Sequence, residues 1–346
     1  MDCFYAAVHM RDDASLAGRP VVVGGDPAGR GVVAAASYEA RHFGIHSAMP
    51  AAEAQRRCPE AVFIRPNFAL YRRESERIFS IYREVTPLVE TLSLDEAYLD
   101  VTEHLGRFGS ATAVAAAIRR RVLETTRLTV SIGVGPSKLV AKIASDQNKP
   151  DGLTVVPPGK VQEFLDPLPV RRLYGVGPAT TTALSELGVT TVMDLRALTL
   201  DRLLGRFGSH GRTLHAFARG IDDRPVRPHR PRKSLGAEET YRHDLRSLAE
   251  VDEQLELLAG EVSAGLRRRG LAATTVTLKV RYADFNTVTR SQSVPLAIWR
   301  AEELLRCART LCERTEAGRR PLRLLGITAS NLYPSALKQL DLFDPD

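Results

Sequence analysis

Cysteine is scarce in this sequence, and the few cysteines present are not spaced to share a bond or a metal. They are Cys3, Cys58, Cys307 and Cys312, and no two form a CxxC pair. That pattern argues against a disulfide framework and against a zinc site. We therefore expect reduced thiols, the usual state in the cytosol.

Long apolar runs are absent as well. No stretch reaches the ~20 residues that a membrane-spanning helix needs, and Met1 is followed at once by Asp2 instead of the basic start of a signal peptide. We expect a cytoplasmic protein with no membrane partner. A glycine turn at residues 133–138 lacks the spacing of a P-loop or a dinucleotide fingerprint, so neither motif is predicted there.

What the sequence does contain is a large apolar fraction and an excess of basic residues. With 346 residues and 44% hydrophobic content, the chain can bury substantial cores, and its length predicts two to four compact units. The formal net charge of +7 favours a polyanionic partner, because basic surface gains free energy by releasing counterions condensed on nucleic acid. Many basic proteins bind no nucleic acid, so charge alone does not decide the matter.

Two adjacent acids, Asp95 and Glu96, interrupt an apolar run between Leu94 and Leu99. Carboxylates where a strand pattern wants apolar side chains are costly to desolvate unless a cation neutralises them. A divalent metal is the expected occupant, and it indicates phosphate chemistry. Because neighbouring strand residues face opposite sides, both acids can address one site only at a strand end or a hairpin turn.

Changes of pattern along the chain predict separate domains. About the first 156 residues alternate strand-like and helical runs, which indicates an α/β layer. Residues 157–225 contain short helices punctuated by glycine, and the basic, proline-rich run 224–233 predicts a tether. Residues 234–333 show the order strand, helix, strand, strand, helix, strand of a separate α+β unit. The clearest expected strands are 20–23, 31–36 and 128–134, and the clearest expected helices are 111–125, 248–269 and 299–314.

Residues 173–184 predict a helix, a tight turn and a second helix. Gly175, Val176 and Gly177 form the turn, and Pro178 opens the second helix. Unpaired N–H groups at such a helix start bind a phosphate oxygen without reading a base. The run resembles the helix-hairpin-helix of DNA-binding proteins, and a plain corner between two helices is the alternative.

One strand of the last unit has a strictly two-sided pattern. From Thr275 to Arg281 the apolar residues fall on one face, and Thr, Lys and Arg fall on the other. If both helices cover the apolar face, a polar and basic sheet face remains in solvent. Such a face suits a duplex backbone, although solvated sheet faces are also ordinary.

Several motifs together resemble the Y family of DNA polymerases, in its bacterial branch. They follow in order from residue 1 to about 333, so chance is a poor explanation. The motifs are Met1–Val8, Ala36–Arg41, Ser93–Tyr98, Ala141–Asp146 with Lys149 and Pro150, and the turn Gly175–Pro178. The resemblance implies a right-hand polymerase of multidomain α/β and α+β fold, with palm, fingers, a helix-hairpin-helix thumb and a βαββαβ little finger. The implied divisions are palm 1–8 and 67–156, fingers 9–66, thumb 157–225, linker 226–233, little finger 234–333 and a clamp-binding tail 334–346.

The resemblance also implies roles around the paired acids. It makes Asp95 a ligand of two catalytic Mg²⁺ ions and Glu96 the second acid, near the primer 3′ hydroxyl, which agrees with two-metal phosphoryl transfer. Tyr5 matches the bulky residue that excludes a ribose 2′ hydroxyl, and a core tyrosine is the alternative. The implied triphosphate contacts are Tyr38, Arg41, Lys149 and the backbone N–H groups of Cys3 and Phe4.

One position departs from the family pattern. In the family, an apolar strand ends in a metal-binding aspartate immediately before the position of Met1. Asp2 is two positions further on and faces the same side of the strand, so we expect it near the metals. We count it among the candidate metal ligands, although the family pattern does not make it one. Our expectation is that the native protein is longer at its N-terminus.

The tail resembles the short motif by which bacterial polymerases dock on the β sliding clamp. Gln339 would hydrogen-bond at the pocket edge, Leu340 belongs to the motif, and Leu342 and Phe343 would fill an apolar pocket. Five-residue motifs often arise by chance, but the position after the last domain strand favours this one. Tethering would supply an effective concentration in the mM range.

The activity implied is template-directed DNA synthesis, which adds deoxynucleotides to a primer 3′ end. The resemblance implies a monomeric lesion-bypass enzyme of DNA repair, with low fidelity and no proofreading. Lys279, Arg281 and Arg290 would contact duplex phosphates, so DNA affinity should fall with salt. Two rivals stay open: a non-catalytic, clamp-tethered DNA-binding protein, and a metal-dependent nuclease that uses the same acids with water as nucleophile.

Overall fold

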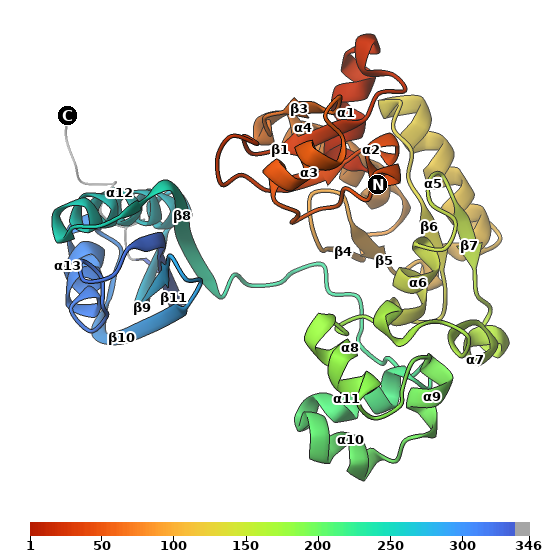
Figure 1. Ribbon diagram of the computed structural model, residues 1–346. Helices are drawn as coiled ribbons and strands as arrows, with labels where there is room; N and C mark the ends of the chain where they lie inside the picture. Colours follow the sequence, from red (N-terminus) through yellow and green to blue (C-terminus); the bar gives the residue numbers. More distant parts are fainter. Residues whose placement is uncertain (336–346) are drawn as a thin grey trace. The chain divides into compact units, whose positions relative to one another are not determined.

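The computed structural model describes residues 1–335, which divide into two compact units (Figure 1). The first unit contains residues 1–27 and 31–229, and the second contains residues 28–30 and the chain from residue 230 onward. Separate hydrophobic cores lie in each unit. No helix among the described residues is long and apolar enough to cross a membrane.

Small sheets and the helices packed on them form most of the first unit. One sheet has the order β2-β1-β3, with β1 antiparallel to β2 and parallel to β3, and two further pairs are β4-β5, antiparallel, and β6-β7, parallel. The strands are β1 Val21–Gly24, β2 Val33–Ala36, β3 Val62–Ile64, β4 Val89–Thr91, β5 Ala97–Leu99, β6 Ile132–Val134 and β7 Leu153–Val155. The helices are α1 Phe4–Asp12, α2 Tyr38–His42, α3 Ala51–Arg57, α4 Phe68–Val85, α5 Ala111–Thr126 and α6 Lys138–Ser145.

The hairpin β4-β5 positions the paired acids. β4 ends at Thr91 and β5 begins at Ala97, so Asp95 and Glu96 lie in the turn between them. The two acids thus lie in a hairpin turn, one of the two positions expected from the sequence. Within the turn, the amide N–H of Leu92 donates to the Glu96 carbonyl oxygen at 2.9 Å.

The close packing of α6 on β6 depends on a glycine. A Cβ atom on Gly133 would lie 2.0 Å from the carbonyl oxygen of Ala141 and 2.4 Å from the amide nitrogen of Ser145. Only a residue without a side chain lets the helix approach the strand this closely. The contact therefore fixes the position of α6, which carries Lys142.

Short helices around their own core form the last part of the first unit. They are α7 Val161–Leu165, α8 Pro178–Ser185, α9 Val192–Ala197, α10 Leu200–Phe207 and α11 Ser209–Phe217. Gly175 has a φ of 85°, and Gly177 directly precedes α8. The first helix of the predicted helix-hairpin-helix is only a 3₁₀ turn, Val170–Arg172, because Pro169 and Gly175 leave too few residues between them for a longer helix.

A four-stranded antiparallel sheet and two helices form the second unit. The sheet order is β10-β9-β11-β8, and α12 and α13 pack on the sheet (Figure 1). The elements are β8 Ser234–Leu245, α12 Leu248–Arg267, β9 Leu271–Tyr282, β10 Thr287–Ile298, α13 Ala301–Cys312 and β11 Leu322–Pro334. The predicted order of strands and helices is confirmed.

The first unit departs from expectation in one strand. Of the predicted strand 128–134, only Ile132–Val134 pairs with a neighbouring strand. Leu128 and Val130 are buried in the core without belonging to a sheet. The alternating apolar residues of this segment therefore reflect burial in the core. Burial and strand pairing produce the same alternation, so the sequence pattern does not distinguish them.

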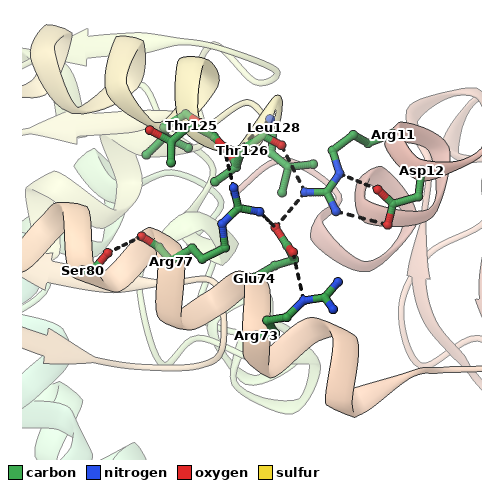
Figure 2. A network of polar contacts seen from close by, with 10 residues as sticks. Arg11, Asp12, Arg73, Glu74, Arg77, Ser80, Thr125, Thr126 and Leu128 are labelled. Carbon is green, nitrogen blue, oxygen red and sulfur yellow. Dashed lines mark hydrogen bonds and ion pairs between the residues drawn. The ribbon is translucent and has the colours of Figure 1, made fainter.

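A buried carboxylate links the helices α1, α4 and α5 through two arginines (Figure 2). Glu74 of α4 is 1% exposed, and its Oε2 accepts hydrogen bonds from Arg11 Nη1 at 2.7 Å and Arg77 Nη1 at 2.8 Å. The same arginines donate to the carbonyl oxygens of Thr126 and Thr125, at the end of α5. The end of α1 is thereby tied to α4 and α5.

We predict that Glu74→Ala destabilises the protein by about 2 kcal/mol, because Arg11 and Arg77 both lose a buried, charged hydrogen-bond acceptor while Arg11 keeps its pair with Asp12. Urea unfolding measures the loss. Ser80→Ala on the same helix removes only an exposed hydroxyl and should change stability by less than about 0.5 kcal/mol. Equal effects of the two substitutions would contradict the assignment.

Candidate active site

The acidic turn lies against the amino group of Met1. That group donates to the Asp95 carbonyl oxygen at 2.8 Å and lies 3.8 Å from Asp95 Oδ2. Asp95 Oδ1 accepts a hydrogen bond from Ser93 Oγ at 2.8 Å. Burial lowers the pKa of the Met1 amino group, while the charge of Asp95 opposes that shift. The first acid therefore lies against a buried donor group.

The second acid has a cation of its own. Lys142 Nζ on α6 donates to Glu96 Oε1 at 2.5 Å. Burial would raise the pKa of Glu96, but the hydrogen bond and charge of Lys142 outweigh it, so the pKa lies below its ordinary value. Lys149 lowers the pKa further by its charge. Glu96 is thus held as a carboxylate.

The donor set of this turn suits Mg²⁺. Among residues 1–335, no three His, Cys, Asp or Glu side chains gather as a complete metal cluster. Mg²⁺ does not require one, because it is commonly bound by one or two carboxylates together with water and substrate phosphates. The oxygen atoms of Asp95 and Glu96 fit that mode of binding.

Asp2 is buried and hydrogen-bonded through both carboxylate oxygens. It is 3% exposed, its Oδ1 accepts from Ser131 Oγ at 2.7 Å, and its Oδ2 accepts from the Asp151 amide at 2.9 Å. Both carboxylate oxygens therefore already have donors. These contacts favour a structural role, and metal ligation by Asp2 stays a prediction.

The start of α1 presents backbone donors. Cys3 precedes the helix with a φ of 36°, and no side chain caps the first turn. Free N–H groups at a helix start attract anions. Burial raises the pKa of the Cys3 thiol to about 11, so the thiol stays neutral and the backbone is the group that can serve an anion.

The ring of Tyr5 packs against two aromatic rings of α4. It stacks on Tyr71 with the ring centres 4.1 Å apart and the planes 13° from parallel, and Phe68 meets it edge-on. Tyr71 is fully buried, and its hydroxyl hydrogen-bonds to His9 Nε2 at 2.8 Å. Burial, followed by the charge of Asp95, raises the pKa of Tyr5.

The predicted triphosphate contacts lie on two elements. On α2, the Arg41 guanidinium lies over the Tyr38 ring at 4.7 Å and donates to the Ala36 carbonyl. The buried Tyr38 hydroxyl lies next to the Asp2 carboxylate but makes no well-aligned hydrogen bond among the described residues, and burial, followed by the charge of Asp2, raises its pKa to about 12. Lys149 follows α6 and pairs with Asp146 at 3.3 Å. A buried hydroxyl without a partner is a group to which a ligand can supply one.

The predicted DNA contacts are only partly brought together. In the hairpin turn, Val176 is buried, so the backbone of Gly175 and Gly177 is what faces outward. Lys279 and Arg281 share the open face of the sheet in the second unit. Arg290 pairs with buried Leu278, so it faces the other side, where it donates to the Arg314 carbonyl. Lys279 and Arg281 pair with Thr289 and Thr287 of β10, and Arg290, next to Thr289, points to the opposite face of the sheet.

The candidate clamp residues Gln339, Leu340, Leu342 and Phe343 lie outside the described residues. Conversely, the sequence interpretation missed Lys142, Tyr71 and Ser131. Lys138 and Lys142 are four residues apart in an apolar helical pattern, so they share a helix face, and that signal could have led to Lys142. Nothing comparable marks Tyr71 or Ser131 in the sequence.

Comparison with known families and proteins covers almost the whole chain. The impB/mucB/samB family matches residues 1–146, its C-terminal domain matches 232–342, and the DNA polymerase-iota thumb domain matches 171–222. DNA polymerase IV of Alkalilimnicola ehrlichii is 55% identical over 99% of this chain and 97% of its own length. DNA polymerase IV of Halorhodospira halophila is 54% identical, over 99% and 96%.

A solved structure gives the same result. The Y-family DNA polymerase chimera Dbh-Dpo4(243-245)-Dbh has a TM-score of 0.86 and 28% identity, over 95% of this chain and 96% of its own. Fold and sequence together thus define a DNA-directed DNA polymerase. The chain belongs to the Y family of DNA polymerases. The family predicted from the motifs is therefore confirmed.

We predict that Lys142→Met raises the pKa of Glu96, because burial then acts without the opposing ammonium. Carboxyl NMR of the metal-free protein measures it. With the folded pKa below the ordinary 4.5, the stability contributed by this pair is complete above pH 4.5 and is lost as pH falls through the folded pKa. The folding stability of Lys142→Met should therefore fall less than that of the unmodified protein over this pH range.

Lys160→Met is the matched control, since Lys160 pairs with Glu163 on the surface. It should leave the pKa of Glu96 unchanged. An unchanged pKa in Lys142→Met as well would show that Lys142 does not hold Glu96.

Proposed function

We propose that the acidic turn of Asp95 and Glu96 is the catalytic centre of this polymerase. The protein is a low-fidelity, template-directed enzyme of translesion synthesis, which adds deoxynucleotides to a primer 3′ end. The observation that carries the proposal is that the turn joins two carboxylates with Lys142, close to the charge of Lys149. The match to polymerases over nearly the whole chain disfavours the non-catalytic alternative.

A metal requirement follows from the family, and we propose two Mg²⁺ ions held by Asp95 and Glu96. When bound, such ions supply Lewis-acid stabilisation of the attacking and leaving oxygens. The protein contributes position: Ser93 orients Asp95, and α6 sets Lys142 beside Glu96. Substrate phosphates and water complete the coordination that the two acids begin.

The incoming triphosphate is bound by groups on both sides of the acidic turn. The Tyr38 hydroxyl gains its missing partner, Arg41 offers a bidentate guanidinium, and Lys149 exchanges Asp146 for a phosphate oxygen. The start of α1 adds N–H donors from Cys3 and Phe4. Tyr5, fixed by Tyr71, lies where its ring excludes a ribose 2′ hydroxyl.

DNA and partner contacts complete the proposal. The Gly175–Gly177 turn holds a backbone phosphate, and Lys279 and Arg281 hold the duplex from the little finger. The family-based divisions into palm, fingers, thumb, linker and little finger, a monomeric state, a cytoplasmic location and clamp docking through the tail also belong to this proposal. Tethering to a clamp would compensate for a weak hold on DNA.

Asp95→Ala should lower the primer-extension rate by on the order of 10³-fold, because charge stabilisation at the reacting phosphate is lost. DNA binding should persist, since the phosphate contacts lie elsewhere. The assay uses Mg²⁺ and four deoxynucleotides, both with the printed chain and with a version that carries the family's strand and aspartate ahead of Met1. Asp100→Ala is the control, because within residues 1–335 its carboxylate bonds to the amide and hydroxyl of Thr102. Primer shortening in place of extension would favour the nuclease.

Tyr5→Ala should reduce the preference for deoxy- over ribonucleotides by on the order of 100-fold. The reason is loss of the ring that occupies the space of the 2′ hydroxyl. Tyr5→Phe retains the ring and should retain the preference. Competitive incorporation of a deoxynucleotide against its ribonucleotide measures the change, and an unaltered ratio in Tyr5→Ala would remove Tyr5 from this role.

A further inference from the structure

The loop that carries Lys149 is a tightly fastened turn. Gly152 folds back on Asn148 so closely that a Cβ would lie 2.1 Å from the Asn148 carbonyl oxygen. Asp151 has a φ of 51°, in the left-handed region. On the other side of Lys149, α6 ends at Ser145, and the Asp146 amide donates to the Ile143 carbonyl. Lys149 therefore lies between the end of α6 and the close turn at residues 151–152.

The fastening of this turn comes from Asp2. The Asp2 carboxylate accepts from the Asp151 amide at 2.9 Å and from Ser131 Oγ at 2.7 Å, and Ser131 Oγ in turn accepts from the Gly152 amide at 3.2 Å. Asp2 and Ser131 are both buried, at 3% and 9% exposed. Hydrogen bonds to a charged group in a buried setting are among the stronger ones in a protein.

A second anchor holds the same turn from outside. Arg119 of α5 donates to the Asp151 carbonyl oxygen and pairs with its carboxylate at 2.9 Å. Asp151 is thus held through its amide, its carbonyl and its side chain. The contact to the Asp151 amide comes from Asp2, whereas the other two come from Arg119. Asp2 directly precedes Cys3 and Phe4, which form the start of α1.

We propose that Asp2 is a positioning residue for the triphosphate: it fastens the 149–152 turn so that Lys149 is presented to the incoming nucleotide. Asp2 thereby couples the two backbone segments that flank the phosphates, the start of α1 and the Lys149 turn. The proposal rests on the role of Lys149 given under the proposed function. It is an alternative to metal ligation by this carboxylate, whose two oxygens each accept a hydrogen bond from the fold.

The test compares Asp2→Asn with Lys149→Ala and the double variant. An asparagine keeps the shape but offers one acceptor in place of two, so we expect the Kd for deoxynucleotide to rise about ten-fold. Binding is measured with a dideoxy-terminated primer, which forms the complex without reaction. In extension assays KM should rise by a similar factor while kcat changes little, and half-saturation by Mg²⁺ should not move.

The double variant should bind deoxynucleotide no more weakly than Lys149→Ala alone, because the turn then has no lysine to present. Ser131→Ala provides a second route to the same loss if Asp2→Asn does not fold. Glu74→Gln is the matched control: it also alters a buried, hydrogen-bonded carboxylate of this unit, and it should lower stability without changing deoxynucleotide affinity.

Two failures are distinguishable. If Lys149→Ala binds deoxynucleotide normally, the proposed role of Lys149 fails, and the role of Asp2 fails with it. If Lys149→Ala weakens binding but Asp2→Asn and Ser131→Ala do not, only the positioning role is overturned. A shift in Mg²⁺ half-saturation in Asp2→Asn without a change in nucleotide affinity also overturns it, in favour of metal ligation.

Discussion

Neutralisation of two adjacent carboxylates is the constraint on which the rest of this structure depends. Asp95 and Glu96 occupy one hairpin turn, where mutual repulsion and partial burial both disfavour two negative charges. Lys142 donates to the second acid, and the charge of Lys149 acts on it as well. Lys142 can do so only because Gly133 lets α6 lie directly on β6. Packing of a helix on a strand thus sets the electrostatics of the catalytic turn.

Two further carboxylates, both buried, hold the surroundings of that turn in place. Asp2 joins the start of α1 to the Lys149 turn, and Glu74 ties the end of α1 to α4 and α5 through arginines. Asp2 holds the end of α1 that offers N–H groups, the stack on Tyr71 holds the Tyr5 ring, and Glu74 stabilises the opposite end of the helix. The buried carboxylates of Asp2 and Glu74 connect separate segments of the chain through their hydrogen bonds. The carboxylates of Asp95 and Glu96 are the ones that we propose bind metal.

Much of this could be predicted from the sequence, and the misses have physical causes. The motifs revealed the family, and the paired acids indicated a strand end or a hairpin turn, because neighbouring residues within a regular strand face opposite sides. Arg290 was grouped with Lys279 and Arg281 by charge, although strand alternation sends it to the other face. The bonds of Asp2 could not be foreseen, since they join residue 2 to residues 131 and 151 through a fold that local patterns do not encode.

The most direct test of the catalytic turn is a crystal structure of the protein with primer-template DNA, a deoxynucleotide and Mg²⁺. The account predicts metal density at Asp95 and Glu96, with the triphosphate held between the start of α1, Tyr38, Arg41 and Lys149. It also predicts that the Asp2 carboxylate keeps its bonds to Ser131 and the Asp151 amide. Metal and triphosphate bound away from the hairpin turn would contradict the account.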